Sequence, residues 1–307
     1  MSAAALDVDG LTHRYGERIA LDGVSFRVEP GEVFGLLGPN GSGKTTLFRI
    51  LSTLVRPTAG SACLLGHDVA AAPAAVRRVL GVVFQHPSVD DLLTVEENLV
   101  HHGRLYGLAG RALAGGIDTV TARLGLRERR RERVGRLSGG LKRRTELAKA
   151  LLVDARVLLL DEPSTGLDPA ARRELLAWLA ELARDGITVV LATHDMEEAE
   201  RCDRVAILDA GRLVALGAPA ALTAEVGGDV VVVHAAAAEA LRERVRARFG
   251  VDGRVVDGTL RLERARGHEL VRDLIEAFPD EVRTVTYGRP TLEDVLVRRT
   301  GHRLAAG

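Results

Sequence analysis

The stretch GPNGSGKTT, Gly38 to Thr46, decides how the rest of the chain is interpreted. It fits the pattern G-x-x-x-x-G-K-[ST], follows an apolar run at 32–37 and opens a helical pattern at 44–54. Its glycines let backbone N–H groups turn toward phosphate oxygens, and the helix N-terminus adds positive potential. An ordinary glycine turn that caps a helix is the alternative, but the strand, loop and helix context favours a phosphate-binding loop.

The side chains of this loop have distinct predicted tasks. Lys44 reaches the outer phosphates of a nucleotide, and Thr45 offers a hydroxyl to Mg²⁺. The chain contains only three lysines, Lys44, Lys142 and Lys149, so a lysine at this position is informative. We predict that nucleotide phosphates are bound along the whole loop, which consists of Gly38, Pro39, Asn40, Gly41, Ser42, Gly43, Lys44, Thr45 and Thr46.

The composition describes a large globular chain without net charge. A chain of 307 residues with 46% apolar residues buries a sizeable core and is long for one domain, so we expect two. The 42 basic and 42 acidic residues cancel, which leaves no overall field toward nucleic acid or an anionic membrane. Cys63 and Cys202 do not have the spacing of metal ligands, so they do not indicate a metal site. No apolar run approaches the ~20 residues that are needed to span a bilayer.

The order of apolar segments predicts the fold. Short apolar runs alternate with helical patterns, which is typical of a mostly parallel sheet covered on both faces. The segment at about 86–152 is poor in strands, and Thr94 with Glu97 forms a capping-box pattern, so we expect a helical subdomain there. The strands are expected at 32–37, 79–84, 157–161, 187–193 and 204–209.

The pattern of the sequence changes at Gly227-Gly228, where we place the boundary between a larger domain at 1–226 and a smaller domain at 227–307. The smaller domain shows the order β-α-β-β-α-β, with a hairpin through Asp257-Gly258. This order is typical of a ferredoxin-like α+β domain. A last helix is expected after Pro290.

The segment VLLLDEPSTGLD, 157–168, supplies what hydrolysis requires in addition to a phosphate loop. Asp161 follows a buried strand and is placed to hold Mg²⁺, and Glu162 is the candidate general base. A solvated surface turn is the alternative. His194 and Gln85 end two further strands at the edge where ligands gather in open α/β folds, although each is also compatible with a structural role.

The stretch LSGGL, 137–141, begins another helix with a serine and two glycines. Read alone, Ser138 is a plain N-cap. The cations Lys142, Arg143 and Arg144 crowd a helix N-terminus, which the macrodipole disfavours, so their charge requires an anion or exposure to solvent. An ion pair between Lys142 and Glu146, one turn further along the helix, would compensate part of this positive charge.

Taken in order, these motifs resemble those of the nucleotide-binding subunits of ATP-binding cassette (ABC) transporters, from Leu6 to about Thr223. The implied fold is the α/β ABC-type P-loop NTPase, with a mostly parallel sheet, an antiparallel β part and a helical subdomain. The implied catalytic group is Glu162, His194 and Gln85, and the implied Mg²⁺ ligands are Thr45, Gln85 and Asp161. The resemblance also implies an adenine platform at Tyr15, which is compatible with simple packing, and a D-loop at Asp168.

The resemblance also gives LSGGL a function. In relatives, this signature binds the γ-phosphate of an ATP held by the other subunit. The implied assembly is a homodimer in which Ser138, Gly139 and Gly140 of one copy close on the ATP at Lys44 of the other. Leu141 departs from the family, which most often has glutamine there, so one polar contact near the nucleotide is in doubt.

Segments 83–108 and 288–301 resemble the daunorubicin-resistance type of drug-exporter ATPase. This implies a separate permease with about six transmembrane helices, and a location at the cytoplasmic face of the membrane. Leu92, Leu93 and Tyr106 are candidate permease contacts or core residues. A soluble ABC ATPase of the DNA-repair type is the alternative, but zinc ligands and basic stripes are missing, and we expect no nucleic-acid partner.

Overall fold

The computed structural model describes residues 4–303, and the chain divides between Leu213 and Val214 into two compact units. The sequence placed the division at 226/227 instead. The second unit begins earlier because helix α8 (Pro219–Ala224) packs against helix α11 (Leu292–Thr300). Arg298 Nη1 of α11 donates a hydrogen bond of 2.7 Å to the carbonyl oxygen of Glu225, directly after α8.

A six-stranded sheet forms the centre of the first unit, in the order β10-β9-β3-β8-β7-β6. The pairs β3–β8, β3–β9, β7–β8 and β6–β7 are parallel, as predicted. Every residue of β3, β7 and β8 is buried, which explains why these strands are mostly apolar. The strands are β3 (Val33–Leu37), β6 (Leu80–Val83), β7 (Val157–Asp161), β8 (Thr188–Thr193), β9 (Arg204–Asp209) and β10 (Arg212–Gly217).

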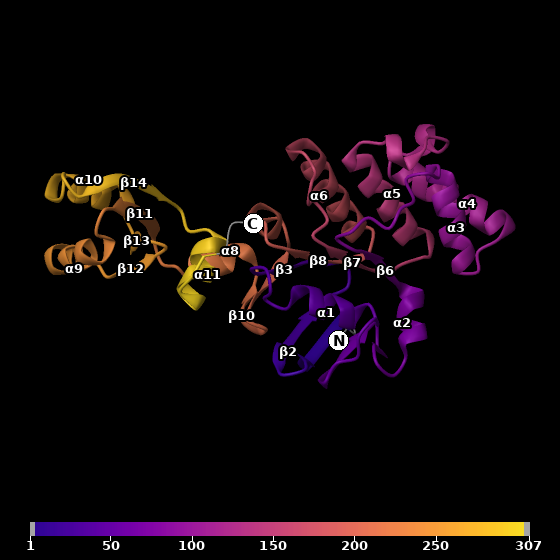
Figure 1. The fold of residues 1–307 in the computed structure, drawn as a ribbon, viewed down its shortest axis with the longest axis horizontal. Helices are drawn as coiled ribbons and strands as arrows, with labels where there is room; N and C mark the ends of the chain where they lie inside the picture. Colours follow the sequence, from indigo (N-terminus) through magenta and orange to yellow (C-terminus); the bar gives the residue numbers. More distant parts are fainter. Residues whose placement is uncertain (1–3, 304–307) are drawn as a thin grey trace. The chain divides into compact units, whose positions relative to one another are not determined.

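A second, antiparallel sheet covers one face of the central sheet, with helix α1 (Lys44–Leu51) between them (Figure 1). The core between these layers is apolar: the rings of Phe26 and Phe34 stack with their centroids 5.2 Å apart, and Phe48 of α1 is fully buried. The strands of the second sheet are β1 (Leu6–Tyr15), β2 (Arg18–Val28), β4 (Ala59–Leu64) and β5 (His67–Asp68).

The chain between β6 and β7 is helical, as the sequence predicts for this segment. Residues 84–156 are all described, and no sheet strand lies among them. Helix α3 starts with the predicted capping box: the Glu97 amide donates to Thr94 Oγ1 at 3.2 Å, and the Thr94 amide donates to Glu97 Oε2 at 2.8 Å. The helices of this unit are α2 (Pro73–Val79), α3 (Val95–Leu105), α4 (Gly110–Arg123), α5 (Gly139–Leu152), α6 (Pro169–Arg184) and α7 (Met196–Glu200), with 3-10 turns at Arg127–Arg129 and Val134–Arg136.

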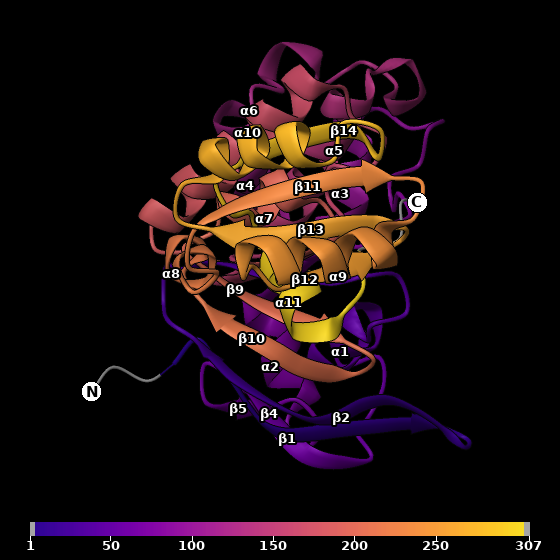
Figure 2. The ribbon, with the colours of Figure 1, turned by 90° about the vertical axis from the view of Figure 1, so that its left-hand side faces the viewer.

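The second unit contains an antiparallel sheet in the order β12-β13-β11-β14. Helices α9 and α10 pack on one face of this sheet, where Val231, Leu241, Leu262 and Leu274 are fully buried (Figure 2). The elements are β11 (Asp229–Ala235), α9 (Ala238–Phe249), β12 (Gly253–Val256), β13 (Thr259–Arg264), α10 (Gly267–Ala277), β14 (Val282–Gly288) and the final helix α11. The predicted order of elements is therefore present.

Candidate functional site

Four parallel strands end side by side and bring the predicted site residues together. The phosphate loop follows β3, His194 follows β8, Glu162 follows β7 and Gln85 lies just beyond β6. The sheet order places β8 between β3 and β7, and β6 beside β7. Because parallel strands share their carboxyl edge, these side chains lie along one edge of the sheet, the usual ligand position in open α/β folds.

The glycines of the phosphate loop are required by close backbone approaches. A Cβ on Gly38 would lie 2.2 Å from the carbonyl oxygen of Leu208, and a Cβ on Gly43 would lie 2.6 Å from that of Ala20. Gly43 also has a φ of 107°, in the left-handed region that side chains disfavour. The glycines at these two positions therefore let the loop pack closely against the backbone of β9 and β2.

Lys44 and Ser42 fit an anion in this loop. Lys44 is buried, and its Nζ donates to the carbonyl oxygens of Gly38 and Pro39 at 2.6 and 3.1 Å. Burial lowers the pKa of Lys44, whereas the carboxylates of Glu162 and Asp161 act to raise it. The buried Ser42 hydroxyl has no hydrogen-bond partner within the described part of the chain. Since buried donors are normally paired, a phosphate oxygen would satisfy it.

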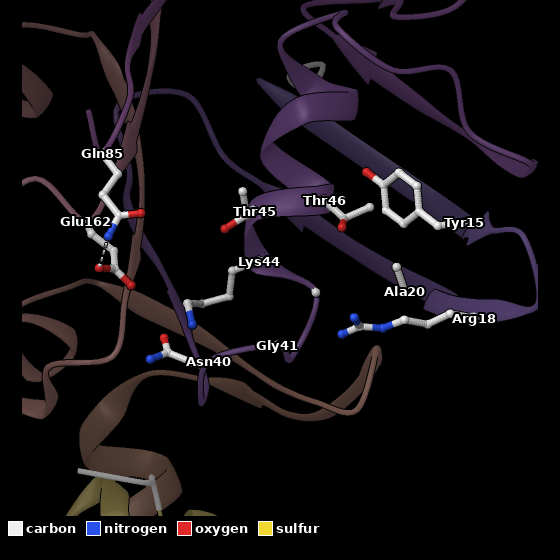
Figure 3. A pocket seen from close by; sticks show the side chains of 11 residues that line it. Tyr15, Arg18, Ala20, Asn40, Gly41, Lys44, Thr45, Thr46, Gln85 and Glu162 are labelled. Atoms are coloured by element: carbon white, nitrogen blue, oxygen red, sulfur yellow. Dashed lines mark hydrogen bonds between the residues drawn. The ribbon is translucent and has the colours of Figure 1, made fainter. Parts of the chain in front are cut away.

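A pocket of about 200 Å³ opens in front of this loop (Figure 3). Tyr15 and Arg18 lie on one side of it, Gln85 and Glu162 lie on the other, and Lys44 lies between them. Tyr15 is 43% exposed, so its ring is available for stacking and is not a core residue. The lining residues are Tyr15, Arg18, Ala20, Asn40, Gly41, Gly43, Lys44, Thr45, Thr46, Gln85 and Glu162.

Glu162 is at the centre of the polar contacts of the site. Its Oε1 lies 3.0 Å from His194 Nδ1, and its Oε2 accepts hydrogen bonds from Gln85 Nε2 at 3.1 Å and Thr165 Oγ1 at 3.3 Å. Glu162 has a φ of 47°, which is uncommon for a residue with a side chain, and its amide donates to Ala192 O at 2.9 Å. Backbone strain of this kind gathers at functional sites, where surrounding contacts hold it.

Asp161 is the candidate metal ligand of the site. It is buried at the end of β7, and burial raises the pKa of its carboxyl, as does the adjacent Glu162, while Lys44 acts to lower it. Among residues 4–303 no cluster of three or more His, Cys, Asp or Glu side chains could hold a metal alone. A Mg²⁺ ion fits this donor set, because Mg²⁺ is usually held by one or two carboxylates together with phosphate oxygens.

The signature residues Ser138, Gly139 and Gly140, which we name the signature tip, do not line this pocket. Ser138 is the N-cap of α5, and its Oγ accepts from the Leu141 amide at 3.4 Å, which is the plain capping geometry. Asp168 is also outside the pocket and caps α6 by accepting from the amides of Ala170 and Ala171. The predicted nucleotide residues therefore form two separate groups in one chain.

The cations behind the signature tip are paired with carboxylates. Lys142 pairs with Asp91 at 2.9 Å and not with Glu146, as the sequence suggested. Glu146 pairs instead with Arg143, at 2.8 Å between two nearly buried side chains. Residue spacing alone favoured a pair within the helix, but Asp91 is brought to Lys142 by tertiary folding. Arg144 pairs with Glu174 of α6.

Fold and site together define a P-loop nucleotide hydrolase, and comparison with known proteins identifies its family. Residues 21–165 match the family model described as ABC transporter. The chain is 42% identical to the daunorubicin resistance ATP-binding protein DrrA3 of Streptomyces coeruleorubidus, over 98% of this chain and 97% of that protein. It is 38% identical to the Nod factor export ATP-binding protein I of Rhizobium sp. (strain N33), over 99% of both chains.

The solved structure of cbiO1 from Clostridium perfringens, part of the ABC transporter complex cbiONQ, matches 81% of this chain and 97% of its own. Its TM-score is 0.68 at 27% identity. The chain therefore belongs to the ATP-binding proteins of ABC transporters. It binds ATP and is an ATPase of that family, which confirms the resemblance drawn from the motifs.

Arg18 is a pocket residue that sequence reasoning missed. It lines the pocket from β2, and its Nη2 lies 3.7 Å from the position that a Cβ on Gly41 would take. Its guanidinium has no ion pair or hydrogen bond with any residue that the structure describes. The available signal was a basic residue three positions after Tyr15, which is too common to be informative.

We expect Arg18→Ala to weaken ATP binding about 10- to 100-fold, because a hydrogen bond to a charged group contributes about 1.5–3 kcal/mol. Titration calorimetry with ATP measures this change. Arg14→Ala is the matched control, because Arg14 is exposed on β1 and does not line the pocket. Equal affinity of Arg18→Ala and wild type would show that the guanidinium does not contact the nucleotide.

Proposed function

We propose that this chain is the ATP-hydrolysing subunit of an exporter that drives a separate permease for a drug, antibiotic or other hydrophobic compound. The observation that carries the hydrolytic part is the placement of Glu162, held by His194 and Gln85, across the pocket from Lys44. The relatives named for drug resistance and for Nod factor export support the export part. They do not favour the DNA-repair alternative.

The proposed mechanism assigns one task to each part of the pocket. Tyr15 stacks on the adenine, and the loop amides with Lys44 bind the phosphates. Glu162 orients and deprotonates the attacking water, and His194 stabilises the charge that develops on the phosphoryl group. Mg²⁺, held by Asp161, Thr45 and Gln85, would neutralise phosphate charge when bound. Gln85 donates to Glu162 through Nε2, which leaves its Oε1 for this role.

We expect Glu162→Gln to reduce ATP turnover at least about 100-fold while ATP affinity stays within a few fold, because an amide keeps the shape but cannot accept a proton. Phosphate release and equilibrium nucleotide binding measure the two quantities. Glu128→Gln is the matched control, because Glu128 is exposed on a 3-10 turn and does not line the pocket. Wild-type turnover in Glu162→Gln would refute the assignment.

We further propose a homodimer in which the signature tip completes the partner's pocket. Ser138 and Gly139 are exposed, and the tip lies outside the pocket of its own chain. A two-fold axis makes the contact reciprocal, so that two ATP molecules are bound between two copies. Hydrolysis then removes the γ-phosphate that joins the halves and allows them to separate. The hydroxyl and amides of the tip supply donors to this phosphate.

Mixing two inactive variants tests this reciprocity. Lys44→Ala disables the pocket, and Ser138→Arg disables the tip. A mixed dimer has one composite site with both defects and one with neither, so we expect an equimolar mixture to recover measurable ATPase activity that neither variant has alone. Recovery requires association, which light scattering with ATP and Glu162→Gln chains detects. A mixture as inactive as its components would contradict the composite site.

We propose that the permease contacts a groove of about 320 Å³ beside β6. Leu54 and Tyr106, which line it, are 64% and 47% exposed, and Phe84 and Val82 also line it. Such exposed apolar side chains fit a partner helix. Of the predicted contacts, Leu92 is 77% exposed and Leu93 is half-buried, and neither lines the groove.

Among the described residues, no helix is long and apolar enough to cross a membrane.

We expect Tyr106→Asp to abolish co-purification with the permease, because a carboxylate in the groove would be desolvated by the docked helix. ATPase activity of the isolated variant should stay at the wild-type level. Leu105→Asp is the matched control: Leu105 is 85% exposed at the end of α3 but does not line the groove. Equal loss of co-purification in both variants would argue against the groove.

The proposed location follows from this docking: the subunit is held at the cytoplasmic face of the membrane by its permease.

We also propose that the second unit is a ferredoxin-like domain. Its β-α-β-β-α-β order and its antiparallel sheet, with β11 and β13 at the centre, support this proposal. An experimental structure with a different strand order would overturn it.

A further inference from the structure

Glu198 is a fully buried carboxyl that no step above uses. It lies on α7, four residues after His194, with 0% of its surface exposed. Its Oε1 accepts a hydrogen bond from the Ser164 hydroxyl, and its Oε2 has no hydrogen-bond partner within residues 4–303. Burial raises the pKa of this carboxyl. It does not line the nucleotide pocket.

A carboxyl in this position is costly for stability. Burying an ionisable group that is only partly hydrogen-bonded costs several kcal/mol, and an apolar side chain of similar volume is often neutral or better. The short helix α7 does not need it for capping, because Asp195 already accepts from the amides of Glu197 and Glu198. The location of its partner gives a more specific reason for the carboxyl.

The hydrogen bond joins the two segments that carry the catalytic pair. Ser164 is two residues after Glu162, in the turn after β7, and Glu198 belongs to the segment after β8 that carries His194. A second contact, the ion pair of Arg172 with Asp195, joins α6, which follows that turn, to the segment that carries His194. The Glu162 and His194 side chains meet at 3.0 Å. Of the two contacts, only the one from Glu198 is fully shielded from water.

We propose that Glu198 is a positioning residue for hydrolysis, which acts through Ser164 to hold Glu162 and His194 at their working separation. This inference rests on the catalytic roles proposed for Glu162 and His194. The strained backbone of Glu162, with its φ of 47°, makes such support necessary, because an uncommon conformation persists only where surrounding contacts fix it. A catalytic group that shifts by about 1 Å loses on the order of 100-fold in rate.

Two substitutions separate positioning from mere packing. Glu198→Gln keeps the shape and an oxygen that accepts from Ser164, so we expect kcat within about threefold of wild type. Glu198→Leu fills the same space without an acceptor, so we expect kcat to fall about 10- to 100-fold while ATP affinity is unchanged. Glu197→Leu is the matched control, because that neighbouring carboxylate is exposed and pairs with Arg201 at the surface. It should keep wild-type kcat.

Ser164→Ala provides an independent test if Glu198→Leu does not fold. We expect it to lower kcat as Glu198→Leu does, and the double variant to lose no more than either single one, because the two side chains act as a unit. Wild-type kcat in soluble Ser164→Ala, or loss in Glu198→Gln equal to that in Glu198→Leu, would overturn the proposal. Glu162→Gln is assayed in parallel: if it retains turnover, the proposed function fails, whatever Glu198 does.

Discussion

The site depends on one constraint, the parallel pairing of β6, β7, β8 and β3. Parallel pairing forces the segments that follow these strands to leave the sheet at the same edge, so Gln85 and Glu162, 77 positions apart in sequence, come within hydrogen-bond distance. The phosphate loop and His194 meet for the same reason, because they follow the neighbouring strands β3 and β8. Catalytic geometry is thus a consequence of sheet formation.

Much of this arrangement can be predicted from the sequence, because the relevant signals are local. Apolar runs mark the buried strands, the glycine spacing marks a loop that approaches Leu208 and Ala20 closely, and Thr94 with Glu97 marks a helix start. What sequence reasoning missed depends on tertiary proximity. The partner of Lys142 is Asp91, 51 residues away, and Arg18 becomes informative only once it lines the pocket. The division at Leu213 depends on α8 meeting α11.

Two buried charged residues lie at the nucleotide site, and burial acts against the ionised form of each. Burial destabilises the ionised forms of Lys44 and Asp161, lowering the pKa of the lysine and raising that of the acid. A bound nucleotide brings phosphate charges that complete the arrangement around Lys44. Arg143 and Glu146 differ in this respect, since they neutralise each other inside the helical segment. Lys44 and Asp161 are placed to meet a ligand, whereas the Arg143–Glu146 pair stabilises the fold.

The contacts that hold the segment after Gln85 have a mechanical consequence. Arg143 donates to the carbonyl oxygen of Phe84, Glu146 accepts from the Ser88 amide, and Lys142 pairs with Asp91, all from the first two turns of α5. Ser138 begins the same helix. These contacts couple the segment after Gln85 to α5. A displacement of this segment should therefore also move Ser138, the N-cap of that helix.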